Sequence, residues 1–500
     1  MTTTQETTLS AKVFPRLYRD SVTLMAMAAS VEKRDGIVRV GAVMATPANV
    51  EILERSGMRP PDLQAAPDDL VIVVRGVDDD VVAQGLDAAE QALTAVESTR
   101  GAREEQAPQT IAEGLAAAER DGSERPTMAT VSTAGTYAPI AVEQALKAGL
   151  HVFCFSDNVP LEDEIRLKAL AVEHRLLMMG PDCGTAIIDG VPLGFANVVS
   201  QGPVGIVAAS GTGAQELSTL LDRAGSGVSQ VIGVGGRDLS AEVGGFMTDL
   251  GLDLLAEDEA TEVVVVVSKP PAAEVADRLL SRLADLAKPA VACLLGVDDS
   301  DDGPVAVRGT LEGGAQAAAR LTGHPLDLAE SPALPAPPSA RGVLGLYTGG
   351  TLAAETAIIL RRGGVEAEVL DLGDDEYTTG RPHPMIDPAA RADRVAAAGS
   401  QADIGIVLVD LVLGYGASAD PATPLADAVR TAKAAATQDG RQLVVLASVC
   451  GTAADPQGLD AQRAVLESAG VLVHPSNAAA ARSAVTLAGG RATTDHEENA

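Results

Sequence analysis

The stretch that decides the fold is Gly202-Pro-Val-Gly-Ile-Val-Ala-Ala-Ser-Gly-Thr-Gly-Ala-Gln-Glu216. Its apolar run Val204–Ala208 predicts a buried strand, and the glycine-rich turn that follows opens a predicted helix ending at Arg223. A buried strand, a tight turn and a helix form the repeating unit of a parallel sheet with crossover helices. The sequence therefore predicts an α/β protein.

The same order recurs in the second half of the chain. A predicted strand, Val343–Leu346, leads through Tyr347-Thr-Gly-Gly-Thr351 into a predicted helix that ends at Arg362. Gly349-Gly-Thr351 matches Ser210-Gly-Thr212 139 residues later, and Met385-Ile-Asp387 matches Met247-Thr-Asp249 138 residues later. Two matches at almost one spacing indicate a duplicated domain.

Strands alternating with helices predict further domains around this pair, because 500 residues exceed what one hydrophobic core can hold. We predict a small N-terminal α/β domain of about three strand-helix units and a second α/β domain before the two copies. The predicted boundaries are 1–100, 101–200, 201–327 and 343–490, with a Pro- and Ala-rich linker at 328–342 and a polar tail at 491–500.

Composition excludes several classes of partner. The net charge of −32 opposes binding to nucleic acid. The longest aliphatic run, Val263–Val267, is too short for a membrane span, and the first residues show no secretory signal pattern. The four cysteines form no Cys-x-x-Cys pair. We therefore expect a reduced, cytoplasmic protein without a membrane or nucleic-acid partner.

The two glycine loops are candidate anion sites. Each follows a strand and opens a helix, where unpaired backbone N–H groups and the positive helix end coincide. A single loop of this kind is more often only a tight turn with a helix cap, but its occurrence in both copies favours binding. The candidate phosphate- or substrate-binding residues are Ser210, Gly211, Thr212, Gly213, Gly235, Gly236, Arg237, Thr348, Gly349, Gly350 and Thr351.

Longer motifs carry a family resemblance. Gly180-Pro-Asp-Cys-Gly184, Gly205–Thr212 and Val231-Ile-Gly-Val-Gly-Gly236 resemble the alpha subunit of succinyl-CoA ligase, and Pro139–Gly149 resembles that subunit's CoA-binding domain. With Tyr18-Arg-Asp-Ser-Val22, Tyr347–Leu352 and Arg381-Pro-His-Pro-Met-Ile-Asp387, the chain from about residue 12 to about residue 490 resembles the FdrA family.

This resemblance implies a Rossmann-like CoA-binding-type domain at 101–200, followed by two flavodoxin-like, succinyl-CoA-ligase-type domains. It places the loop with Asp182 and Cys183 at the active site. It also implies binding of CoA or a nucleotide, although the sequence alone assigns no cofactor.

The resemblance implies two activities that differ in chemistry. An acyl-CoA ligase would carry a phosphoryl group on a histidine after the strand Ala290–Leu295, but the loop Gly296–Gly303 holds four aspartates and no histidine. The other activity is that of an oxamate carbamoyltransferase subunit, which works with two further subunits on oxalurate, oxamate, phosphate and carbamoyl phosphate. Because this chemistry needs positioning rather than a phosphohistidine, we expect a carbamoyltransferase that handles these small anions.

The ligase-like acyl-CoA synthetase and a non-catalytic scaffold remain the alternatives, and a homo-oligomer is compatible with all three. His383 and Arg381, on one proline-rich loop, are the predicted catalytic pair. Cys183 is more typical of a packed residue than of a nucleophile, and the aspartate-rich runs are typical of solvated loops. We therefore predict no metal site.

Overall fold

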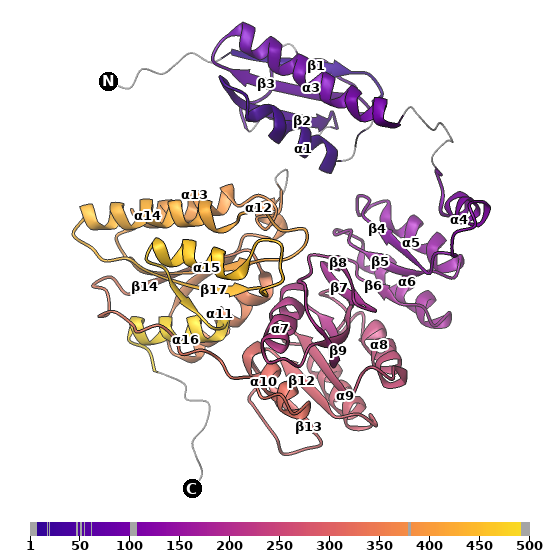
Figure 1. Cartoon of the computed structure of the whole chain (residues 1–500), viewed down its shortest axis with the longest axis vertical. Helices are drawn as coiled ribbons and strands as arrows, with labels where there is room; N and C mark the ends of the chain where they lie inside the picture. Colours follow the sequence, from indigo (N-terminus) through magenta and orange to yellow (C-terminus); the bar gives the residue numbers. More distant parts are fainter. Residues whose placement is uncertain are drawn as a thin grey trace. The chain divides into compact units, whose positions relative to one another are not determined.

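The computed structural model describes residues 8–491, apart from 18, 20, 47, 48, 51, 52, 55, 62, 101–107 and 379–381. The chain forms two compact units, 1–109 and 110–500, which are described separately. Figure 1 shows their elements coloured along the sequence.

The first unit is a three-stranded antiparallel sheet with order β1-β3-β2. Its strands are β1 (Thr8–Phe14), β2 (Ile37–Met44) and β3 (Leu70–Gly76), and helices α1 (Ser21–Glu32) and α3 (Asp79–Arg100) pack on it. This is the small α/β domain that the sequence predicts, and its sheet is antiparallel because β1 and β2 both run antiparallel to β3.

The second unit begins with α4 (Ile111–Arg120) and a small parallel sheet, β4-β5-β6. Its strands are β4 (Met128–Val131), β5 (His151–Cys154) and β6 (Met178–Met179), connected by helices α5 (Ala138–Lys147) and α6 (Leu161–Glu173). This is the Rossmann-like domain that the sequence predicts.

The first repeat domain is a seven-stranded sheet with order β13-β12-β11-β9-β10-β7-β8. Its parallel strands are β9 (Gln201–Ala209), β10 (Val228–Gly233), β11 (Val263–Ser268), β12 (Ala290–Leu294) and β13 (Val305–Arg308). A hairpin of β7 (Thr185–Ile188) and β8 (Val191–Gly194) extends the sheet. Its helices are α7 (Gly211–Arg223), α8 (Phe246–Glu257), α9 (Ala273–Ala284) and α10 (Leu311–Leu321).

The second repeat domain is a five-stranded parallel sheet with order β15-β14-β16-β17-β18. Its strands are β14 (Gly342–Tyr347), β15 (Ala367–Asp371), β16 (Ile404–Val412), β17 (Val444–Cys450) and β18 (Leu472–His474). Its helices are α11 (Gly350–Arg362), α12 (Asp375–Thr378), α13 (Ala389–Ala398), α14 (Ala422–Gln438), α15 (Leu459–Ser468) and α16 (Asn477–Ala488). The parallel strands of both repeats therefore follow the order second, first, third, fourth, fifth.

These sheets confirm the predicted multi-domain α/β fold, with a small N-terminal α/β domain, a Rossmann-like domain and two flavodoxin-like domains. Individual elements differ from the sequence prediction. The apolar residues among 13–18 predict a first strand over that range, but β1 ends at Phe14, where a proline follows. The sequence pattern does not predict β13, whose apolar run is brief, or α16, whose apolar residues are mostly alanine.

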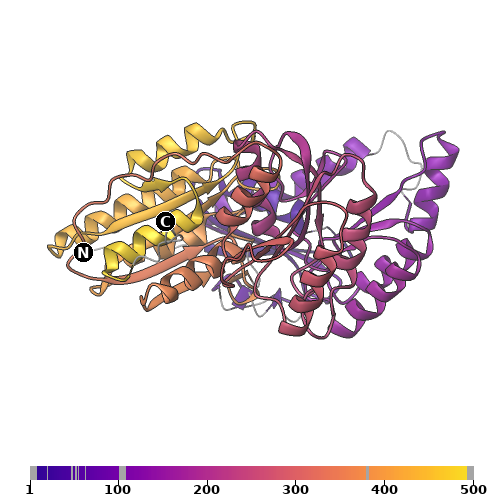
Figure 2. The ribbon, with the colours of Figure 1, turned by 90° about the horizontal axis from the view of Figure 1, so that it is seen from below.

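The two repeats pack against each other through their first and last helices. Glu355 on α11 accepts a hydrogen bond from the backbone N–H of Leu311, which begins α10 in the other repeat, at 2.7 Å. Reciprocally, Glu216 on α7 accepts from the N–H of Asn477, which begins α16, at 3.2 Å. Each repeat thus supplies a carboxylate to the N-terminus of the other's last helix. In Figure 2 the first repeat lies between the second repeat and the Rossmann-like domain.

Candidate functional site

The two glycine loops meet where α7 and α11 begin. The hydroxyls of Ser210 and Thr351 are 2.5 Å apart, and the backbone N–H of Thr351 donates to Oγ1 of Thr212 at 3.3 Å. Ser210 also caps α7 by accepting from the N–H of Gly213 at 2.9 Å. The predicted residues Ser210, Thr212 and Thr351 are therefore brought together, but they are buried and bond to each other.

The second loop already holds an anion of the protein's own. The carboxylate of Asp410 accepts from the backbone N–H groups of Thr348 at 2.9 Å and Gly349 at 2.8 Å. Asp410 is itself paired with the buried guanidinium of Arg391 at 2.9 Å. Burial raises the pKa of Asp410, while Arg391 opposes that rise. The residue at the same register in the first repeat is Val267, so the corresponding carboxylate is missing from that position.

A charged cluster surrounds the first residue of α11. A Cβ on Gly350 would overlap Oδ2 of Asp371 and would lie 3.4 Å from Nζ of Lys269. Lys269 directly follows β11 in the first repeat, and Asp371 ends β15 in the second. Each residue stands at the carboxyl end of a strand in its own sheet, and both side chains reach the positive end of α11. Burial raises the pKa of Asp371 to about 6.

His383 lies beside this cluster. Its Nε2 lies so close to Gly373 that a Cβ on this glycine would overlap it. The N–H of Gly373 donates to Oδ1 of Asp371 at 2.9 Å. Nδ1 of His383 accepts from the N–H of Met385 at 3.2 Å. Because burial lowers the pKa of His383 to about 4, the ring is neutral near pH 7 and its proton lies on Nε2. This nitrogen is therefore a hydrogen-bond donor.

The loop containing Asp182 and Cys183 reaches the first glycine loop through its next residues. A Cβ on Gly211 would lie 3.9 Å from the Cα of Gly184 and 3.5 Å from Oγ1 of Thr185. Cys183 is buried, and burial raises its pKa to about 12. Its thiol therefore remains protonated and acts as a packed side chain.

Arg237 bonds to residues of the Rossmann-like domain. Its Nε pairs with Glu164 of the Rossmann-like domain at 2.8 Å, and another nitrogen donates to the carbonyl of Val159 at 2.8 Å. The preceding Gly235 passes close to the carbonyl of Pro181, while Gly236 is exposed. In this structure Arg237 joins two domains rather than facing the cluster at α11.

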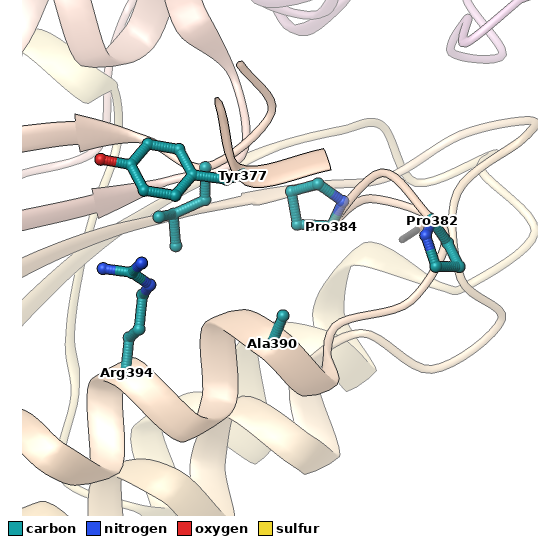
Figure 3. A pocket seen from close by; sticks show the side chains of 6 residues that line it. Tyr377, Pro382, Pro384, Ala390 and Arg394 are labelled. Atoms are coloured by element: carbon teal, nitrogen blue, oxygen red, sulfur yellow. The ribbon is translucent and has the colours of Figure 1, made fainter. Parts of the chain in front are cut away.

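Arg381, the other predicted catalytic residue, lies outside the described residues. A pocket adjoins the segment that carries His383, and Figure 3 shows the side chains around it. In it, the guanidinium of Arg394 lies 4.8 Å from the centre of the Tyr377 ring. The lining residues are Leu372, Tyr377, Pro382, Pro384, Ala390 and Arg394.

Sequence reasoning missed Lys269, Asp371 and Asp410. A usable signal was present, since Lys269 and Asp371 stand at the carboxyl ends of predicted strands, where α/β proteins bind ligands. Asp410 follows a predicted strand in the same way. The glycine motifs are recognisable patterns, whereas a single polar residue after a strand is not.

A relative in Escherichia coli decides the family. Its YahF protein is 37% identical to this chain over 498 residues, and the match covers 93% of this chain and 95% of that protein. The chain belongs to the YahF family. Within it, residues 346–487 match the CoA-ligase domain, residues 199–287 the CoA binding domain and residues 7–110 the AllF heavy metal-associated domain.

Curated ligases are similar to parts of this chain. The succinate–CoA ligase [ADP-forming] subunit alpha 1 of Archaeoglobus fulgidus is 30% identical over 164 residues, covering 32% of this chain and 55% of the ligase subunit. An acetyl-coenzyme A synthetase from Ca. Korarchaeum cryptofilum, solved with phosphate and ADP, aligns with a TM-score of 0.29 and 16% identity over 72% of this chain and 82% of its own. The match thus spans about half the length of the Archaeoglobus ligase subunit.

These matches correct the expected activity. The predicted carbamoyltransferase is wrong, because the matching domains and curated relatives are of CoA-ligase type. The succinyl-CoA-ligase-like character expected of an FdrA-like chain is confirmed. The physical reason for the error is that the two loops were taken as open anion sites, whereas one is filled by Asp410 and both are packed together.

The heavy metal-associated match requires a test against the residues present. Residues 7–110 contain neither cysteine nor histidine, so this domain offers no thiolate or imidazole to a soft metal ion. Across the part of the chain that the structure describes, no group of three or more His, Cys, Asp or Glu side chains could hold a metal ion. None of the described helices is both long and apolar enough to cross a membrane.

Proposed function

We propose that this chain transfers an acyl group between phosphate and CoA, which is the part of a CoA-ligase reaction that needs neither a nucleotide nor a phosphohistidine. The domain matches and ligase relatives support CoA and an acyl compound as ligands. The observation that carries the proposal is the convergence of Lys269 and Asp371 on the positive end of α11, with neutral His383 beside them.

Each group has a role in this chemistry. Lys269, beside the positive end of α11, binds the phosphate group, because the N–H groups of Thr348 and Gly349 are already bonded to Asp410. The Nε2–H of His383 donates to the carbonyl oxygen as negative charge develops there. Asp371 accepts the thiol proton as the C–S bond forms and the C–O bond to phosphate breaks. A base with a pKa of about 6 suits this step near neutral pH.

Arsenolysis tests the proposal. With acetyl-, succinyl- and benzoyl-CoA, we expect arsenate-dependent release of free thiol, because the acyl arsenate hydrolyses at once. Lys269→Ala and His383→Ala should each lower the rate by roughly 10²-fold or more. Lys147→Ala is the matched control, since Lys147 is an exposed lysine paired with Glu143 on α5. Absence of thiol release with all three thioesters would rule out acyl transfer.

A non-catalytic scaffold is the second candidate, and the closed packing of the glycine loops favours it. Ser210 and Thr351 satisfy each other, as expected of loops that only join two domains. This candidate predicts CoA binding without arsenolysis, so calorimetry with CoA beside the thiol assay separates the two functions.

A further inference from the structure

Aromatic side chains are scarce in this protein, with five Phe, five Tyr and no Trp in 500 residues. Even so, phenylalanines and His383 form one row. The ring centres of Phe153 and Phe155 are 6.3 Å apart, those of Phe155 and Phe195 are 5.7 Å apart, and those of Phe195 and His383 are 5.7 Å apart. The row joins the Rossmann-like domain, through the end of β5, to the second repeat.

The row leads directly to the charged cluster. His383 contacts Gly373, whose N–H binds Asp371. Phe195 is held in place because its carbonyl accepts from Oγ1 of Thr185 at 2.6 Å, and because Gly416 lies against its ring. The aromatic groups therefore have a fixed position relative to the groups that would bind phosphate.

The far end of the row, Phe153, is buried, but its neighbour Phe155 is open to solvent. Phe155 is 37% exposed and follows β5, at the carboxyl edge where parallel sheets bind ligands. One end of this arrangement is the positive end of α11, and the other is the row of phenylalanine rings. Together they complement a ligand that has an anionic end and a flat, apolar end.

The geometry points to a carboxylic acid with an aromatic acyl group as the substrate class, its ring stacked on Phe195 and Phe155 and its carboxyl carbon beside His383. This inference rests on the proposed acyl transfer and narrows it. It predicts discrimination against small dicarboxylates, whose second charge would have to be desolvated against phenyl rings.

The test compares benzoyl-CoA with acetyl-CoA in the arsenolysis assay. The ratio of their kcat/KM values should favour benzoyl-CoA in the unmodified chain. It should fall by roughly 2- to 10-fold in both Phe155→Ala and Phe195→Leu, because an aromatic pair is worth about 0.5–1.5 kcal/mol. Tyr137→Ala is the control, since Tyr137 is 67% exposed and lies outside the row.

Two results of the arsenolysis assay would overturn the inference. An equal loss for both thioesters would mean that the row binds the part common to them, the pantetheine arm of CoA. A ratio that favours acetyl-CoA in the unmodified chain would exclude an aromatic acyl group.

If no thioester reacts, acyl transfer itself fails. Saturation-transfer NMR with benzoate and acetate then tests whether the row binds an aromatic ring. The inference is contradicted if benzoate shows no saturation with the unmodified chain. It is also contradicted if benzoate saturation is unchanged in Phe155→Ala.

Discussion

At the scale of single residues, the surroundings of Asp371 and His383 decide which of them accepts a proton. Asp374 follows Asp371 by three residues, yet Asp371 is half-buried beside the start of α11 while Asp374 is exposed. Burial raises the pKa of Asp371 and lowers that of His383, which reverses their ordinary order. The carboxylate is thus suited to accept a proton, and the imidazole to donate a hydrogen bond.

This ordering predicts the pH dependence of acyl transfer. The rate should rise with pH through about 6 as Asp371 loses its proton, without a histidine inflection near 6.5, because His383 titrates near 4. In Asp371→Asn the rise should disappear and the rate should fall by about 10²- to 10⁴-fold. Asp374→Asn should keep the full profile, measured as kcat/KM from pH 5 to 9. An unchanged inflection in Asp371→Asn would remove its role as the base.

The sequence predicted His383 because prolines on both sides fix its loop. Lys269 and Asp371 lie 102 residues apart and on different repeats, so only folding brings them to one helix end. The burial that raises the pKa of Asp371 depends on tertiary contacts and has no local sequence pattern.

At the scale of elements, the glycine loops were located correctly as strand-to-helix turns, but their partners could not be foreseen. A glycine pattern predicts that the backbone needs room, yet it does not say what fills that room. At Gly349 the space is taken by Thr212 of the other repeat, and at Gly350 by Asp371. Both neighbours come from distant segments of the chain.

Replacing Gly350 with alanine tests this close approach. The added methyl group would overlap Oδ2 of Asp371, so we expect a loss of about 1–3 kcal/mol in the free energy of unfolding and a large loss of acyl transfer. Gly303→Ala is the matched control, because a Cβ there meets no atom within 4 Å. Urea titration and arsenolysis give the two readouts, and equal behaviour of both variants would contradict the packing described for α11.

At the scale of the whole molecule, the two repeats depend on each other for capping. Glu355 receives hydrogen bonds from the N–H of Leu311 and, at 2.7 Å, from the side chain of Asn477. It is fully buried, and this burial raises its pKa to about 7 from an ordinary value of 4.5. The charged form is therefore costly in the folded chain.

The sign of the resulting pH effect follows from linkage. Between pH 4.5 and 7 the folded chain binds more protons at Glu355 than the unfolded chain, so stability falls as pH rises through this window. Glu355→Gln should lack that fall. Its free energy of unfolding relative to the unmodified chain should increase by up to about 3 kcal/mol from pH 4.5 to 8. Exposed Glu368→Gln should show no such trend, and a parallel pH dependence in Glu355→Gln would contradict this account.

The carboxylate of Asp410 has a consequence for how the duplicated halves can change over time. One half carries its own counter-ion at its loop, whereas the other has Val267 at that register. A gene duplication within one chain starts with two equivalent copies, and an internal counter-ion makes them unequal. The two loops are then no longer interchangeable, so selection can refine each of them separately.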